Sequence, residues 1–145
     1  MDWQRQLTAP RATVEVPRVL FVCVQNAGRS QLAAMFLQQL AGRLAVVDSA
    51  GSRPAEALHE NVAQVMTEHG ASVAGVRPQA LTEGKVRSAD YVITMGCGDD
   101  CPVFDHVHYE DWPVGDPDEA DWEALEQIVA DIERRVADFW DRLRR

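Results

Sequence analysis

The feature that most constrains the fold is an abrupt change of pattern near the start of the chain. Val19-Leu20-Phe21-Val22 is a continuous apolar run, which is typical of a strand buried on both faces. A helical pattern follows from Ser30 to Leu40 and ends at Gly42, a residue type that often terminates helices. A buried strand that leads directly into a helix indicates an α/β fold with a parallel sheet.

The rest of the chain continues this alternation of strands and helices. Further strands are predicted at Leu44–Val47, Tyr91–Met95 and Val107–Tyr109, and further helices at Asn61–Glu68 and after a capping Thr82. A long C-terminal helix is predicted from apolar residues that recur at threes and fours: Trp122, Leu125, Val129, Ile132, Val136, Phe139 and Leu143. We expect this helix to cover the sheet, the alternative being a helix that binds a partner. Strands alternating with helices predict a parallel sheet covered on both faces.

Length and charge narrow the possible functions. The 145 residues fit one catalytic domain, predicted over residues 17–145, with residues 1–16 as an N-terminal extension. A formal net charge of −9 argues against nucleic acid and anionic membrane surfaces as partners. No apolar run reaches the roughly 18 residues of a membrane span, and the polar N-terminus does not resemble a secretion signal, so we expect a cytoplasmic protein.

The segment between the first strand and the first helix has the spacing of an anion-binding loop, Cys-x5-Arg. Successive backbone N–H groups of a tight loop can form an anion cradle, and the helix N-terminus adds a partial positive charge. Arg29 supplies a planar fork for two oxygens, and Cys23 lies where this field favours a thiolate. A merely buried cysteine is the structural alternative. The predicted anion loop consists of Cys23, Val24, Gln25, Asn26, Ala27, Gly28, Arg29 and Ser30.

With this loop, the chain resembles the low-molecular-weight phosphotyrosine phosphatase family, and in particular its arsenate reductase branch. The further matching stretches are Ser49-Ala50-Gly51, Ala57-Leu58-His59, Arg77-Pro78-Gln79-Ala80-Leu81-Thr82, Met95-Gly96-Cys97-Gly98-Asp99 and Tyr109-Glu110-Asp111-Trp112. The resemblance implies a three-layer fold with a four-stranded parallel sheet. It also implies that Cys23 is the nucleophile, that Arg29 and the loop amides hold the oxyanion, and that Ser30 hydrogen-bonds to the thiolate. Asn26 would hold the shape of the loop, against Ser49.

Expelling a leaving group from the anion requires a proton donor. Asp116-Pro117 matches the position of the family's general acid. The alternative is structural, because Asp followed by Pro is also typical of a helix N-cap and the first helical residue. Tyrosine phosphatases of this fold usually follow the acid with Pro-Tyr, whereas Asp118 stands here. This departure favours a small inorganic substrate.

Two further cysteines, Cys97 and Cys101, follow the predicted third strand. Because ligand sites lie at the carboxyl ends of the strands, both are expected near Cys23. A thiol relay is the preferred interpretation, in which a second thiol attacks Cys23 after arsenate has bound to it. Incidental thiols and a zinc site with His106 and His108 are the alternatives, and we predict no metal. The Cys-x3-Cys spacing is shorter than in the thioredoxin-coupled branch.

The sequence therefore predicts an arsenate reductase that binds no cofactor. Its partners would be arsenate, with phosphate or sulfate as mimics, and an external thiol reductant, which is either thioredoxin or mycothiol with mycoredoxin. A protein tyrosine phosphatase is the nearest alternative. A non-catalytic protein that senses oxyanions is the alternative from another functional class.

Overall fold

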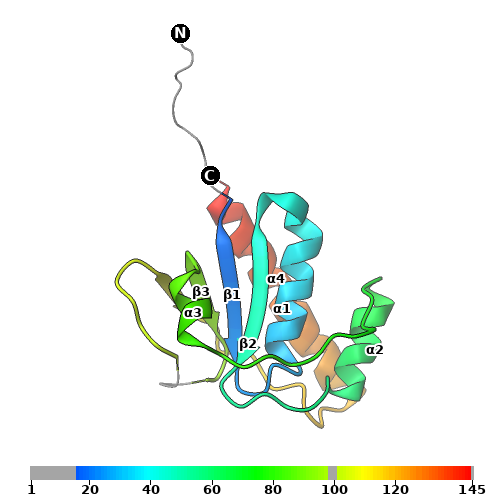
Figure 1. Cartoon of the computed structure of the whole chain (residues 1–145). Coiled ribbons are helices and arrows are strands. Elements are labelled where there is room, and N and C mark those ends of the chain that lie inside the picture. The colour runs from blue at the N-terminus through cyan, green and yellow to red at the C-terminus, as the bar shows by residue number, and fades with distance from the viewer. Residues whose placement is uncertain (1–15, 98–100, 145) are drawn as a thin grey trace.

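Four strands form one parallel sheet in the order β2-β1-β3-β4 (Figure 1). The computed structural model describes residues 16–97 and 101–144, and the statements below concern those residues. The chain begins with β1 (Arg18–Cys23), α1 (Arg29–Ala41), a 3-10 turn (Gly42–Leu44), β2 (Val46–Gly51) and α2 (Glu60–Glu68). It continues with α3 (Glu83–Arg87), β3 (Tyr91–Thr94), β4 (His108–Asp111) and α4 (Trp122–Leu143). The predicted extension lies outside the described residues except for Val16.

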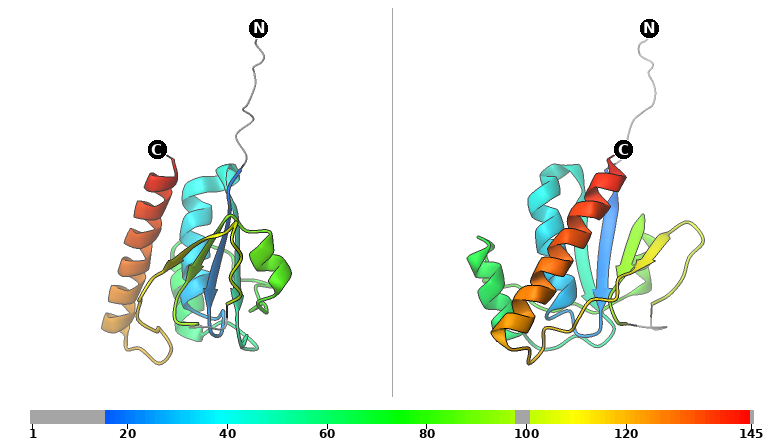
Figure 2. Two further views of the ribbon diagram at one scale, coloured as in Figure 1. Left: turned by 90° about the vertical axis from the view of Figure 1, so that its left-hand side faces the viewer. Right: turned by 180° about the vertical axis from the view of Figure 1, so that it is seen from behind.

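The sheet is covered on both faces, as the sequence predicts. Helices α1 and α4 lie on one face and α3 lies on the other (Figure 2). One core cluster packs between the sheet and the α1/α4 layer and includes Phe21, Leu32 and Phe139. A second, smaller cluster on the α3 side includes Leu20, Val92 and Val86. The alternation of side chains along β1 explains both clusters, because residues 19, 21 and 23 face one layer and residues 20 and 22 the other.

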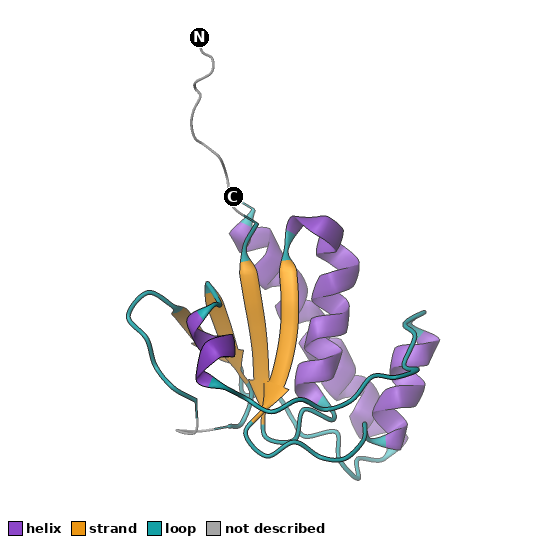
Figure 3. Cartoon of the chain, viewed as in Figure 1, coloured by secondary structure: helices purple, strands orange, loops and turns teal. Residues whose placement is uncertain are grey.

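The topology fixes where a ligand can bind. The chain passes from β1 to β2 on one side and then crosses to β3 on the other side of β1, so the strand order reverses at β1. Open α/β sheets bind ligands at such a switch point, beyond the carboxyl ends of the strands. The loops that follow β1 and β3 meet there, at the end of the sheet to which the strand arrows of Figure 3 point.

Helix α4 extends along the sheet, and both ends of the segment leading into it are fixed. At the start of that segment, Trp112 is buried and contacts the rings of Phe21 and Phe139. At its end, Asp121 caps α4 by accepting a hydrogen bond from the N–H of Ala124 (2.8 Å). The intervening residues, 113–120, therefore form a loop held at both ends, which we call the acid loop because it carries Asp116. No described helix has the length and apolar character needed to cross a membrane.

Three sequence expectations need correction. The strand predicted at Leu44–Val47 begins at Val46, because Gly42 takes a left-handed conformation (φ 54°) and the next residues form a 3-10 turn. Trp122 was assigned to the apolar face of the last helix, but it is 44% exposed, because it lies at the first helical position, beyond the sheet-facing stripe. The strand predicted at Val107–Tyr109 begins at His108 and extends to Asp111, because the N–H of Val107 closes a turn onto the Phe104 carbonyl.

Candidate active site

The anion loop, residues 23–30, is held open by backbone hydrogen bonds from the segment that follows β2. The carbonyl groups of Cys23, Val24, Gln25 and Ala27 accept from the N–H groups of residues 52, 53, 55 and 59, at 2.8 to 3.1 Å. The N–H groups of residues 24–28, by contrast, donate to no acceptor among the described residues. Because the carbonyls are all engaged outside the loop, the N–H groups remain available for an anion. Helix α1 begins directly afterwards, with no side chain capping its N-terminus.

Cys23 is the last residue of β1 and is 2% exposed. Its Sγ lies 2.9 Å from Oγ of Ser30, in the first turn of α1. The same Ser30 oxygen accepts a hydrogen bond from Nδ2 of Asn26 at 2.7 Å. The Ser30 hydroxyl still has its proton available, so it can donate to the sulfur when Cys23 is a thiolate.

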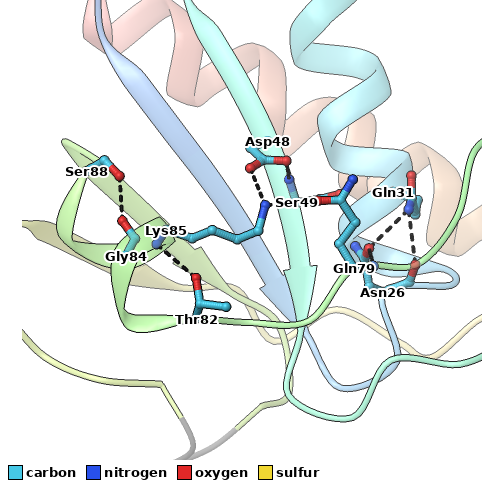
Figure 4. A network of polar contacts seen from close by, with 9 residues as sticks. All are labelled: Asn26, Gln31, Asp48, Ser49, Gln79, Thr82, Gly84, Lys85 and Ser88. Atoms are coloured by element: carbon cyan, nitrogen blue, oxygen red, sulfur yellow. Dashed lines mark hydrogen bonds and ion pairs between the residues drawn. The ribbon is translucent and has the colours of Figure 1, made fainter.

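Asn26 is the buried centre of the polar network shown in Figure 4. It takes a left-handed conformation (φ 51°), and its Oδ1 accepts from the N–H of Gln79 (2.8 Å) and from Nε2 of Gln31 (3.2 Å). The network continues through the side chain of Gln79, whose Oε1 accepts a hydrogen bond from Nζ of Lys85 (2.9 Å). Lys85 also pairs with Asp48 (2.7 Å). Asn26 therefore joins the anion loop to the segment before α3.

Ser49 does not play the part that the resemblance implies. The side chain of Asn26 contacts Ser30, Gln31 and Gln79, and Ser49 is not among its hydrogen-bond partners in the described chain. Ser49 is a buried residue of β2 whose N–H donates to Oδ1 of Asp48. The partner that fixes Asn26 is a backbone N–H of Gln79, which no side-chain pattern reveals.

Arg29, the first residue of α1, lies between the anion loop and the end of β3. Its side chain is 14% exposed, and Nη2 lies 3.7 Å from Oδ2 of Asp116. The guanidinium packs against Gly96, where φ is 88° and a Cβ atom would lie only 2.6 Å from Nη1. A glycine at position 96 therefore leaves room for the arginine fork and takes a backbone conformation that other residues rarely adopt.

The acid loop folds over the anion loop. A Cβ atom at Gly28 would lie 2.7 Å from Cγ of Pro117, so the two loops touch at these residues. Nδ2 of Asn61, from α2, donates to the Pro117 carbonyl at 2.9 Å. Asp116 is 57% exposed, and its Oδ1 accepts from the N–H of Asp118 (2.9 Å). The alternative role of Asp116 as a helix cap is wrong, because Asp121 caps α4.

These segments enclose a cavity of about 160 Å³. Its lining residues are Cys23, Val24, Gln25, Gly28, Arg29, His59, Asp116 and Asp118. The structure thus brings together Cys23, Arg29 and Asp116 as predicted. It places Asn26, Ala27 and Ser30 in the buried support of the loop. Sequence reasoning missed His59 as a lining residue, although it stands in one of the stretches that resemble the family.

Cys97 and Cys101 are buried free thiols in the core cluster on the α3 side of the sheet, whereas Cys23 belongs to the cluster on the other side. Burial, together with the negative charges of Cys101, Cys23 and Asp111, raises the pKa of Cys97 to about 11. Burial also raises the pKa of Cys101. Both distal thiols are therefore protonated at neutral pH.

Comparisons with known proteins agree with this geometry. Residues 18–145 match the family model described as low molecular weight phosphotyrosine protein phosphatase. A putative arsenate reductase of Halobacterium salinarum is 38% identical over 126 residues, which cover 83% of this chain and 89% of the relative. The solved structure of a thioredoxin-dependent arsenate reductase of Corynebacterium glutamicum is 40% identical, with a TM-score of 0.80. That match covers 92% of this chain and 64% of the solved one.

A solved arsenate reductase in the phosphate-binding state is 26% identical, with a TM-score of 0.73 over 85% of this chain and 95% of the solved one. The family match extends over nearly the whole described chain and includes the anion loop, the acid loop and both distal cysteines. The chain therefore belongs to the low molecular weight phosphotyrosine protein phosphatase family.

Proposed function

We propose that the protein is a cytoplasmic arsenate reductase that uses Cys23 as its nucleophile. The observation that carries this proposal is the buried Cys23 thiol, 2.9 Å from the Ser30 hydroxyl, beside the N–H groups of residues 24–28, which have no acceptor in the described chain. Such a site fits a tetrahedral oxyanion. The relatives named as arsenate reductases support arsenate as that oxyanion.

In the first step, the Cys23 thiolate attacks the arsenic atom of arsenate and forms a sulfur–arsenic bond. An oxygen of the arsenate leaves as hydroxide and takes a proton from Asp116, whose carboxyl group borders the cavity. The loop N–H groups and the Arg29 fork hold the remaining oxygens, whose negative charge they stabilise. This step leaves arsenic in its oxidised state, covalently bound to the enzyme.

In the second step, a thiolate attacks Sγ of Cys23. The sulfur–arsenic bond breaks, its electron pair remains with arsenic, and arsenite leaves while the two sulfurs form a disulfide. Cys97 is the proposed attacking residue, and Cys101 then attacks Cys97 to release Cys23 and form a second disulfide. An external dithiol of the thioredoxin type reduces that disulfide. Because burial raises the pKa of Cys97 to about 11, Cys97 must lose its proton before it attacks.

A protein tyrosine phosphatase is the rival function within the same family. Among the described residues, the cavity lining contains two acidic side chains, Asp116 and Asp118, and no Phe, Tyr or Trp. A phosphotyrosyl ring would find no Phe, Tyr or Trp side chain to pack on in this part of the chain and would meet the negative charge of Asp118. The lining therefore favours a small inorganic oxyanion.

Replacing Cys23 with Ser tests the nucleophile. We expect Cys23→Ser to lose arsenate reduction by roughly 10³-fold or more, together with any side activity on aryl phosphates. The measurement is arsenite release by the purified protein, with circular dichroism as the control for folding. A variant that still turns over at a substantial rate would contradict the assignment. A parent protein that binds arsenate and releases no arsenite would instead be a sensor.

Replacing Asp116 with Asn tests the general acid. Asn removes the proton donor but can still accept the N–H of Asp118, so thermal stability should change little. We expect arsenate reduction to fall by about 10²-fold, the contribution typical of a general acid. Hydrolysis of an aryl phosphate with a good leaving group should fall much less. Equal losses on both substrates would argue against a role in proton donation.

The relay is tested by removing the distal thiols one at a time. With a thioredoxin system as the donor, Cys97→Ser and Cys101→Ser should each stop multiple turnover. Cys101→Ser should still release one equivalent of arsenite, because Cys97 is present to attack Cys23. Arsenite counted against enzyme concentration in a rapid-mixing experiment measures this directly.

The same two variants distinguish the reductants. If both cycle at the parent rate when supplied with mycothiol and a mycoredoxin, an external thiol resolves Cys23 and the internal relay is wrong. The relay is supported if neither variant turns over repeatedly with thioredoxin or with mycothiol and mycoredoxin, while Cys101→Ser still releases one equivalent of arsenite.

A further inference from the structure

His59 lies where three segments meet at the cavity. Its backbone N–H donates to the Ala27 carbonyl (3.1 Å), and a Cβ atom at Gly28 would lie 3.2 Å from its Cδ2, so the ring packs on the anion loop. Its Nδ1 lies 3.7 Å from Oδ1 of Asp118 in the acid loop. The side chain is 18% exposed and lines the cavity.

The structural role of His59 at the start of α2 does not require an imidazole side chain. His59 is the N-cap residue of α2, but its side chain makes no capping hydrogen bond. The contact that supports the anion loop is made by its backbone, which any residue other than proline could supply. The ring can therefore serve another role. The contacts described above place it against the anion loop and near Asp118.

The charges around the cavity show what that role requires. Among the described residues that line it, Arg29 is the one permanent cation, and Asp118 brings a negative charge, whereas Asp116 carries the proton that it donates in the proposed reaction. The nearby charged residues on the segments that adjoin His59 are exposed: Arg53, Glu56 and Glu60. Cys23 adds a second negative charge when it is a thiolate. A doubly charged oxyanion thus enters a site in which one cation faces two anionic groups.

We propose that His59 is a specificity-determining residue that supplies the second positive charge of the oxyanion site. Protonated and paired with Asp118, the imidazolium neutralises the carboxylate at the edge of the cavity and attracts a small, doubly charged tetrahedral oxyanion. Histidine is the side chain whose charge ordinarily changes between about pH 5 and 8, so a cavity that depends on an imidazolium should bind the oxyanion more weakly at pH 8 than at pH 6. The inference rests on the proposed function, since it concerns the same cavity.

Sulfate binding to the Cys23→Ser protein isolates this effect. Sulfate keeps the same charge between pH 6 and pH 8, and the serine removes the titration of Cys23 itself. Calorimetry should show sulfate binding about fivefold weaker at pH 8 than at pH 6. Adding His59→Gln should weaken binding at pH 6 by a similar factor and abolish the pH dependence. Adding His59→Lys, whose charge is permanent in this range, should keep tight binding at both values.

His108→Gln is the matched control, because His108 is exposed at the first residue of β4, at the opposite end of the sheet from the anion loop. It should leave sulfate binding and its pH dependence unchanged. In the enzyme with Cys23 intact, His59→Gln should raise KM for arsenate about fivefold with a smaller change in kcat. Thermal melting of each variant reports whether it is folded.

Equal sulfate affinity at pH 6 and pH 8 in the Cys23→Ser protein would overturn the inference, and so would an unchanged pH dependence in either His59 variant. A folded Cys23→Ser protein that binds sulfate at neither pH would refute the proposed oxyanion site itself, and the inference with it. A loss of sulfate binding in His59→Lys alone, with His59→Gln still showing the parent affinity at pH 6, would also contradict a role for positive charge.

Discussion

The hydrogen bonds between the anion loop and residues 52–59 are the interaction on which the site depends. Four carbonyl groups of the loop are engaged by backbone N–H groups of that segment, and the loop's own N–H groups are left for a ligand. The side chain of Asn26 stabilises the same loop conformation through hydrogen bonds to Gln79 and Ser30. Backbone N–H groups therefore supply a positive field to the proposed oxyanion site of a protein whose formal net charge is −9.

The topology brings the other groups to this loop. Because the strand order reverses at β1, the end of β3 lies beside the anion loop, and Gly96 packs directly against Arg29. The acid loop reaches the site because Trp112 and Asp121 hold its two ends. Pro117 then rests on Gly28, which brings Asp116 near Arg29. The distal thiols lie across the sheet, in a separate core cluster. Their burial raises both pKa values, so a thiolate at either position is disfavoured at neutral pH.

Much of this arrangement is visible in the sequence, because its signals are local. The apolar run before Cys23, the Cys-x5-Arg spacing and the periodicity of the last helix predict the first strand, the anion loop and α4. Sequence patterns fail where the decisive contact is made by the backbone or depends on tertiary position. Gln79 binds Asn26 through a main-chain N–H, Trp122 has the right spacing but lies beyond the sheet, and His59 reaches the cavity only because α2 starts beside Gly28.

In the proposed site, the anion loop and Arg29 together hold an oxyanion above Cys23. The most direct test is the rate at which iodoacetamide alkylates Cys23, measured by mass spectrometry with and without saturating arsenate or phosphate. Oxyanion should slow alkylation strongly in the parent protein. In Arg29→Lys, which keeps the charge but loses the fork, the concentration needed for half protection should rise by at least about tenfold. Equal protection in the two proteins would contradict the account.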